Sequence, residues 1–319
     1  MTFGHTTDEA EANRIVDLAF EAGVNFFDTA NSYAGTRTET ILGKALAGRR
    51  REAVVATKFC NPMGPGPNDS GMSRVFIMNT VEDSLRRLQT DYIDLLYIHH
   101  VDWDTPLDEM LRAMEDLVRA GKVCYSACSN YEAWRLMEAI WIADSKGWDH
   151  FACYQPQYSL VVRDIEEEII PVCRLKGVGV AVWGPLAFGF LTGKYKPGQR
   201  ELAGTRSEEK WVFPDQYFAQ SADDTLLELL AVSEQLDRSP AQVAIRWVLE
   251  QPAITSAIVG ARTVSQFRDS LGAANFSLEG ELLERLNTVS QPNVRYPKGI
   301  SAGMRARRAS ALDMPSLSD

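Results

Sequence analysis

Four titratable side chains of different types stand at or just beyond the ends of short apolar runs. Asp28 ends one run, Tyr33 follows five residues later, Lys58 ends the next run, and His99 ends the one after that. A phenol with an ordinary pKa near ~10 is a weak proton donor, but an ammonium about 4 Å away lowers that pKa. We expect Lys58 to be this ammonium, Asp28 to hold it charged and oriented, and His99 to donate a hydrogen bond to a substrate oxygen. Together these groups predict a proton donor for a carbonyl.

These side chains meet only if the segments that carry them lie side by side. Short apolar runs alternate with segments of helical period, which is typical of consecutive βα units. The clearest helical periods cover residues 12–20 and 107–118, the second opened by Thr105-Pro106. The predicted strands are residues 24–28, 53–58, 92–99, 122–129, 151–155, 178–183 and 254–260.

Parallel strands joined by helices form either a closed barrel or an open sheet. Seven strands plus one that includes or precedes residues 1–3 favour a single-domain α/β fold over residues 1–319, a (β/α)8 TIM barrel. An open dinucleotide-binding sheet would carry G-x-G-x-x-G after its first strand, and none is present there. Barrels place their chemistry where strands end, as the four side chains require. Residues 189 to about 220 are expected to form a long loop, and residues 291–319 a flexible C-terminal tail.

Composition and charge exclude several classes of protein. The chain has 45% hydrophobic residues, enough for a large core, and its net charge of −10 leaves no positive excess for binding nucleic acid. Five cysteines without a C-x-x-C pair favour a reducing, cytoplasmic location, and four histidines without an H-x-x-x-H pair disfavour a metal site. No run is long enough for a membrane span, so the expected partner is a small molecule; a homo-oligomer is compatible with the sequence.

Several longer segments resemble the aldo-keto reductase family, in particular a bacterial branch close to the potassium-channel β subunits. The resemblance covers nearly the whole chain. It implies a (β/α)8 barrel that binds extended NADPH and reduces aldehydes or ketones, with Asp28, Tyr33, Lys58 and His99 as the catalytic residues. The segments that carry it are residues 23–46, 56–59, 91–102, 126–131, 154–160 and 182–195.

The resemblance also implies where the cofactor binds. It places Ser129, Asn130 and Gln155 against the nicotinamide carboxamide and stacks Trp183 on the ring. Arg262 is the candidate for the 2′-phosphate, which favours NADPH over NADH, since a guanidinium binds phosphate bidentately. The pyrophosphate would lie against Leu186, Ala187, Gly189, Lys194 and Arg206, and the adenosine phosphate against Gly260, Arg262, Gln266 and Asp269. Gly184, Pro185 and Ser270 are further residues of the implied cofactor site.

The chain departs from the family pattern at three places. Ser270 stands where Asn is usual and Gly184 where Ser is common, so one or two cofactor hydrogen bonds are expected to be lost. The N-terminal hairpin and most of the first strand of relatives precede the part that matches residues 1–4, so the hairpin is expected to be absent. His100 is expected to face away from its neighbour His99 on an extended strand, as packing or a rim contact.

The residues thus predict an NADPH-dependent oxidoreductase that transfers hydride to an aldehyde or ketone carbonyl. Two alternatives stay open. One is a regulatory protein like the channel β subunits, which binds the cofactor and acts mainly on a partner. The other is a reductase of nucleotide-linked sugars or secondary metabolites, because substrate choice depends on loops whose shape a single sequence does not give.

Overall fold

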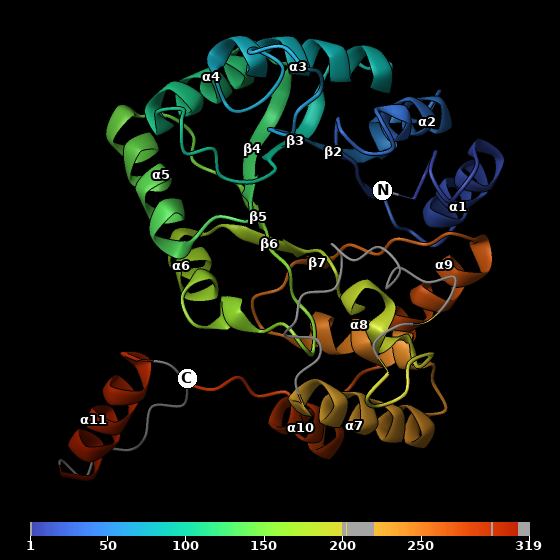
Figure 1. The fold of residues 1–319 in the computed structure, drawn as a ribbon, viewed down its shortest axis with the longest axis vertical. Helices are drawn as coiled ribbons and strands as arrows, with labels where there is room; N and C mark the ends of the chain where they lie inside the picture. Colours follow the sequence, from blue (N-terminus) through green and yellow to red (C-terminus); the bar gives the residue numbers. More distant parts are fainter. Residues whose placement is uncertain (1, 200–201, 203–219, 295, 312–319) are drawn as a thin grey trace.

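The protein is a parallel sheet of seven strands, curled inside a ring of helices, in a computed structural model that describes residues 2–199, 202, 220–294 and 296–311 (Figure 1). The strands pair in chain order from β1 to β7, and every pair is parallel. A connection between neighbouring parallel strands needs a crossover, which here is a helix on the outside of the sheet. The architecture is that of an α/β barrel.

All seven strands predicted from the apolar runs are present, each shorter than or close to its predicted length. They are β1 Phe26–Asp28, β2 Val54–Phe59, β3 Ile93–Ile98, β4 Val123–Ser129, β5 Cys153–Gln155, β6 Gly179–Val182 and β7 Ser256–Ala257. The α-helices are α1 Glu9–Glu21, α2 Arg37–Ala45, α3 Arg74–Leu88, α4 Leu107–Arg119, α5 Ala133–Lys146, α6 Ile169–Lys176, α7 Gln220–Leu236, α8 Pro240–Glu250, α9 Val264–Leu271, α10 Gly280–Val289 and α11 Lys298–Ala311. Short 3-10 turns are η1 Arg50–Glu52, η2 Asp164–Glu166, η3 Ala187–Thr192 and η6 Gly272–Asn275.

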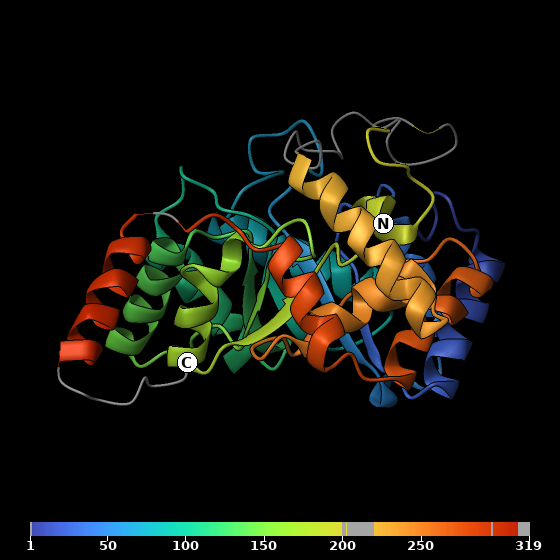
Figure 2. The same cartoon turned by 90° about the horizontal axis from the view of Figure 1, so that it is seen from below.

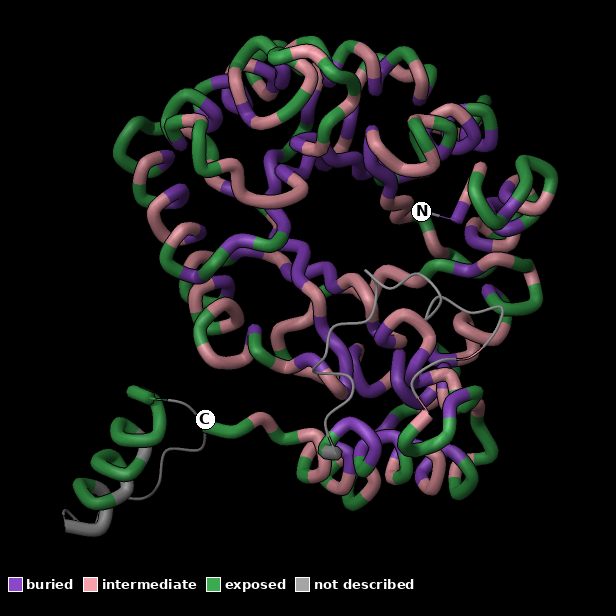
Figure 3. Tube along the Cα trace, in the orientation of Figure 1, coloured by how far each residue is buried: buried purple, intermediate pink, exposed green. Residues whose placement is uncertain are grey.

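The helices cover the outer face of the sheet with their apolar stripes. In α4, residues three and four apart are buried, including Leu107, Met110, Leu111 and Met114, and Asp108 in the first turn favours the positive end of the helix. These side chains join one continuous core with outward-facing strand residues such as Leu96. Figure 3 shows the result: most residues of β2 to β6 are buried, and exposed residues lie mainly on the outside of the helices.

The inner face of the sheet has its own small core. Ala56, Leu95, Tyr97 and Ala127 form a buried cluster there, against which Cys153 also packs. Because side chains alternate faces along a strand, the residue two positions further along points to the same interior, nearer the carboxyl end of the strand. This places Lys58, His99, Ser129 and Gln155 each one inward position beyond the cluster residue of its own segment, and the register pairs Lys58 with Tyr97 and Ser129 with Gln155.

Two predictions concern the ends of the chain. Within the described residues the sheet has seven strands, and near the start only an isolated bridge joins Phe3 to Thr7, so the eighth strand remains a prediction. The segment predicted as a flexible C-terminal tail contains the helix α11, which stands outside the ring of helices (Figures 1 and 2). Of the predicted long loop, η3 and the residues up to Gln199 are described. No described helix has the length and apolar character needed to cross a membrane.

Candidate active site

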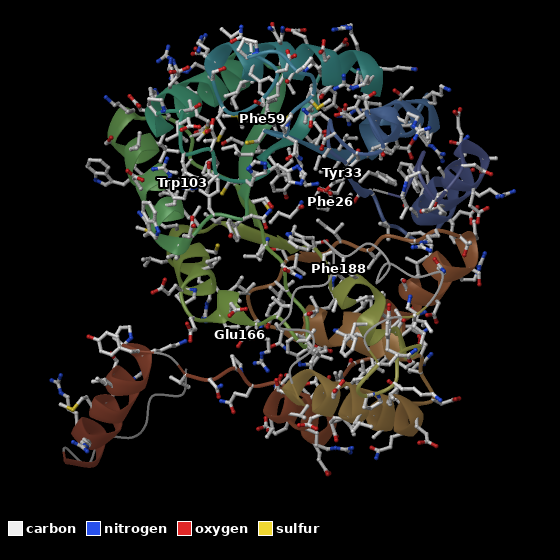
Figure 4. All side chains as sticks on the ribbon, in the orientation of Figure 1. Phe26, Tyr33, Phe59, Trp103, Glu166 and Phe188 are labelled. Carbon is white, nitrogen blue, oxygen red and sulfur yellow. The ribbon has the colours of Figure 1, made fainter. Side chains whose placement is uncertain are left out.

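The first three of the four predicted side chains meet around the ammonium of Lys58. This side chain is 1% exposed, forms an ion pair with Asp28, and donates a hydrogen bond of 2.8 Å to the Thr29 carbonyl. Its Nζ lies 5.0 Å from the centre of the Tyr33 ring. Figure 4 shows Tyr33 beside Phe26, toward the middle of the ring of strands. A buried ammonium is stable only when paired, and here a carboxylate and a carbonyl pair it.

His99 completes the group from the other side of Tyr33. Its ring meets the Tyr33 ring edge-on, with centroids 5.7 Å apart. The backbone N–H of His99 donates to the Phe59 carbonyl at 2.9 Å, which continues the pairing of β3 with β2 beyond the last strand residue. The structure therefore brings together all four side chains that the sequence singled out.

Local backbone bonds carry Tyr33 back over the end of β2. The N–H of Thr29 donates to the Ala56 carbonyl at 2.9 Å, and the N–H of Asn31 donates to the Lys58 carbonyl at 3.0 Å. The chain then turns at Ala34 and Gly35, whose φ angles are 50° and 60°. Left-handed backbone is inexpensive at Gly, so this loop is fixed where it leaves the strand and bends sharply after the tyrosine.

The ionisation of the group follows from burial and from the lysine charge. Burial raises the pKa of Tyr33 by more than the Lys58 charge lowers it, so the net lowering expected from the sequence is wrong in direction. Burial lowers the pKa of Lys58, but Asp28 and then Tyr33 raise it, and the net direction is upward. Burial and the charges of Lys58 and His100 lower the pKa of His99 to about 3. The site therefore holds a neutral phenol, a charged ammonium and a neutral imidazole.

These directions predict the pH dependence of carbonyl reduction, the activity expected from the sequence. Because the pKa of His99 is lowered to about 3 and that of Tyr33 is raised, neither group changes charge near neutrality. We expect kcat/KM for an aldehyde to stay constant between about pH 5 and 9, where a histidine with its ordinary pKa of ~6.5 would give an inflection. Single-turnover rates in buffers of constant ionic strength measure this. An inflection near pH 6.5 that persists in His100→Phe would contradict the neutral His99.

The residues predicted to meet the nicotinamide contact one another and two of the four side chains' segments, those of Asp28 and His99. Ser129 donates to the Gln155 carbonyl at 2.6 Å, and the Gln155 amide donates to the second oxygen of Asp28 at 2.8 Å. The indole N–H of Trp183 donates to Asn130 Oδ1 at 3.2 Å, and the Asn130 amide donates to the His99 carbonyl at 2.9 Å. Gln155 thus also holds the Asp28 carboxylate, a contact that the sequence did not indicate.

The residues after β6 form a turn of unusual backbone conformation. Ala187, Phe188 and Gly189 have φ angles of 47°, 55° and 101°, in the left-handed region. A methyl group added to Gly189 would lie 2.9 Å from Nζ of Lys194, so the bare glycine gives room for an ammonium beside the backbone. The turn also contains Gly184, Pro185 and Leu186 of the predicted cofactor site. Arg206 lies outside the described residues.

The predicted adenosine-phosphate residues follow β7 and enter α9. The N–H of Arg262 donates to Gln266 Oε1 at 2.9 Å, and Ser270 donates to the Gln266 carbonyl at 3.1 Å. The Asp269 carboxylate accepts hydrogen bonds from Ser239 and Gln242, both at 2.9 Å, so it ties α9 to α8. Gly260 is exposed just before Arg262, which is partly buried. The Asp269 carboxylate therefore already has hydrogen-bond donors from the protein. Arg262 lies two residues before the first residue of α9.

Two residues near the site, Phe188 and Asn61, were not predicted from the sequence. Phe188 packs against Trp183, with ring centroids 5.9 Å apart. Asn61 lies between His99 and His100 and hydrogen-bonds both imidazoles. His100 was expected to face away from its neighbour, but β3 ends at Ile98, so the alternation of an extended strand does not apply to it. The pair of adjacent histidines after an apolar run was the sequence signal that both imidazoles could lie at the site.

A parallel α/β barrel with a paired lysine and a tyrosine where its strands end defines a class of barrel oxidoreductases. Within that class the chain belongs to the aldo/keto reductase family, whose model matches residues 1–291. It is 41% identical over 300 residues to the uncharacterized oxidoreductase YrpG of Bacillus subtilis (strain 168), covering 91% of this chain and 90% of the relative. It is 34% identical over 307 residues to a probable voltage-gated potassium channel subunit beta of Arabidopsis thaliana, covering 93% of each.

Proposed function

We propose that this protein reduces an aldehyde or ketone with NADPH, using Tyr33 as the proton donor. The observation that supports it most directly is the buried ammonium of Lys58, held by the Asp28 carboxylate and lying 5.0 Å from the Tyr33 ring centre. An ammonium next to a phenol stabilises the phenolate that forms when the proton leaves. A site built only to bind a ligand has no need for this arrangement.

The residues around the opening fit a nicotinamide dinucleotide. Short amide and hydroxyl groups of Ser129, Asn130 and Gln155 suit a carboxamide, and the Trp183 ring suits a flat heterocycle. The left-handed turn at Gly189, with the Lys194 ammonium beside it, suits a pyrophosphate. Arg262 would hold the 2′-phosphate. When bound, the cofactor supplies the hydride for the carbonyl carbon.

The side chains of this chain supply the proton and the orientation. His99 donates a hydrogen bond to the carbonyl oxygen, which polarises the C=O bond. Tyr33 gives its hydroxyl proton to the same oxygen as negative charge develops there, so the product is an alcohol. Lys58 stabilises the resulting phenolate, and Asp28 and the Thr29 carbonyl keep its ammonium in place.

The direct test is cofactor binding followed by turnover. Purified protein is titrated with NADPH and with NADH by fluorescence, and bound NADPH is then mixed with a panel of reactive aldehydes that includes 4-nitrobenzaldehyde. We expect tighter binding of NADPH and aldehyde-dependent oxidation. Binding without turnover of any aldehyde would count against the reductase.

The cofactor assignment predicts different effects of two cationic side chains. Arg262→Met is expected to weaken NADPH binding at least about tenfold and to leave NADH within about twofold, since a charge-assisted hydrogen bond to phosphate is worth ~1.5–3 kcal/mol. Lys194→Met serves as the matched control, because both cofactors carry the pyrophosphate and should lose affinity equally. Fluorescence titration measures the four dissociation constants. Equal losses of NADPH and NADH in Arg262→Met would exclude the 2′-phosphate role.

A second candidate is a cofactor-binding regulatory subunit, supported by the similarity to a relative named as a probable potassium channel subunit beta. It predicts NADPH binding with slow turnover and a dedicated partner. The complete set of Asp28, Tyr33, Lys58 and His99 favours the enzyme. The five cysteines form no disulfide, which suits a reducing compartment. We therefore propose that the protein acts in the cytoplasm.

A further inference from the structure

Asn61 lies directly after β2, between two imidazoles. Its amide nitrogen lies 3.0 Å from Ser32 Oγ and 3.1 Å from His99 Nδ1, and its amide oxygen lies 2.9 Å from His100 Nε2. The side chain is partly buried and follows Cys60, whose φ of 126° turns the chain sharply out of the strand. One amide therefore contacts three polar groups, and one of these is the imidazole that faces the tyrosine.

The structure places the Asn61 amide nitrogen toward Ser32 and His99 and the amide oxygen toward His100. An amide nitrogen carries two hydrogens, and here both have an acceptor, Ser32 Oγ and His99 Nδ1. The amide oxygen has no hydrogen, so its contact with His100 requires the proton on Nε2 of that ring. In the reversed orientation, the oxygen would accept from the Ser32 hydroxyl and from a proton on His99 Nδ1, so the orientation of this amide and the tautomer of His99 go together.

This orientation fixes the proton on His99. A nitrogen that accepts a hydrogen bond from Asn61 has no hydrogen, so the neutral imidazole carries its proton on Nε2. His99 is neutral near pH 7, because its pKa is lowered to about 3 by burial and by the charges of Lys58 and His100. A neutral imidazole donates a hydrogen bond from one nitrogen only, and the other tautomer would present a lone pair to a carbonyl oxygen.

We propose that Asn61, held by His100, is a positioning residue that keeps His99 in the Nε2–H tautomer, so that the imidazole donates to the substrate carbonyl. His100 acts from one step further away: its Nε2–H holds the amide oxygen, while its Nδ1 lies 3.1 Å from the Val101 carbonyl and 3.6 Å from Cys60 Sγ. The proposal rests on the proposed reductase, because it assigns His99 its role toward a carbonyl.

The test compares the tautomer of His99 with turnover in matched variants. The chain has four histidines, so 15N-labelled histidine gives four imidazole spin systems, which single His variants assign. Asn61→Leu keeps the approximate side-chain volume but removes the amide. Asn68→Leu is the control in the same loop, since Asn68 is exposed.

We expect His99 of the unaltered protein to show the Nε2–H pattern, and Asn61→Leu to show a mixture of both tautomers. In that variant kcat for aldehyde reduction should fall at least about tenfold, the range that positioning partners of active histidines reach, with the NADPH dissociation constant unchanged. Asn68→Leu should change neither quantity. Asn61→Ser, whose hydroxyl can still donate to Nδ1, should recover part of both.

An Nδ1–H pattern in the unaltered protein would overturn the proposal, as would an unchanged tautomer in folded Asn61→Leu. A changed tautomer with unchanged kcat would overturn the functional role. Failure of the reductase itself shows separately, as absence of turnover in the unaltered protein, whereas the tautomer is measured without substrate or cofactor.

Discussion

Tyr33→Phe is expected to lower the rate of carbonyl reduction by ~10²–10⁴-fold, the contribution of a positioned proton donor. Phenylalanine keeps the ring that lies 5.0 Å from Lys58 Nζ and meets His99 edge-on, so packing should be preserved. Only the hydroxyl proton is lost. The NADPH dissociation constant should stay within about twofold, because the cofactor contacts assigned above come from other residues. Stopped-flow oxidation of NADPH and fluorescence titration measure the two quantities.

Tyr97→Phe is the matched control for this prediction. Tyr97 is also buried, and its ring centre lies 5.9 Å from the same ammonium, but its hydroxyl donates to Cys153 Sγ at 3.2 Å. It lies one layer deeper in the barrel, in the buried cluster with Ala56 and Ala127. Its removal should change the rate little. Retained turnover in Tyr33→Phe, or a larger loss in Tyr97→Phe, would assign the proton to another group.

Lys58→Met is expected to impair both catalysis and folding. The rate should fall by ~10²-fold or more, because the phenolate loses the charge that stabilises it. The free energy of unfolding should fall by about 3–5 kcal/mol, because the Asp28 carboxylate, whose side chain is 8% exposed, loses its ionic partner and keeps only the Gln155 amide. Urea unfolding followed by circular dichroism measures the second effect.

The double variant Asp28→Asn with Lys58→Met separates the two effects. With the carboxylate neutralised, no buried charge is left unpaired, and stability should recover by at least ~1 kcal/mol relative to Lys58→Met alone. Catalysis should not recover, because the ammonium is still absent. If the double variant is less stable than the single one, the loss in Lys58→Met comes from packing and not from the stranded carboxylate.

The barrel and the meeting of four titratable side chains at its strand ends were predictable because they depend on local patterns. Apolar runs such as the one before Asp28 are bounded by turns and helical periods, and parallel strands bring their carboxyl ends together whatever the loops do. Lys58 and Ser129 could therefore be placed on the same face from their positions in β2 and β4 alone. The helix α11 was not predicted, because the side chains of Lys298–Ala311 that the structure describes are exposed and show no buried apolar stripe of the kind from which helices are recognised.

The protonation states of the site were harder to predict from the sequence. Distance arguments correctly gave the direction in which Lys58 acts on Tyr33, but burial acts in the opposite direction and is larger. Burial depends on every segment packed over the phenol, and a sequence pattern does not measure it. The same holds for His99, whose low pKa comes first from burial.

The sequence by itself thus determined the order of strands and helices, the four side-chain types of the candidate site, and the end of the barrel at which they lie, because these follow from periodicity and from the parallel connection of neighbouring strands. Only the tertiary structure decided which polar groups touch. Gln155 donates to Asp28 across 127 positions of the chain, and Asn61 reaches both His99 and His100 from another strand end. Such contacts depend on side-chain directions and loop turns fixed to about an ångström by packing, and spacing along the chain carries no record of them.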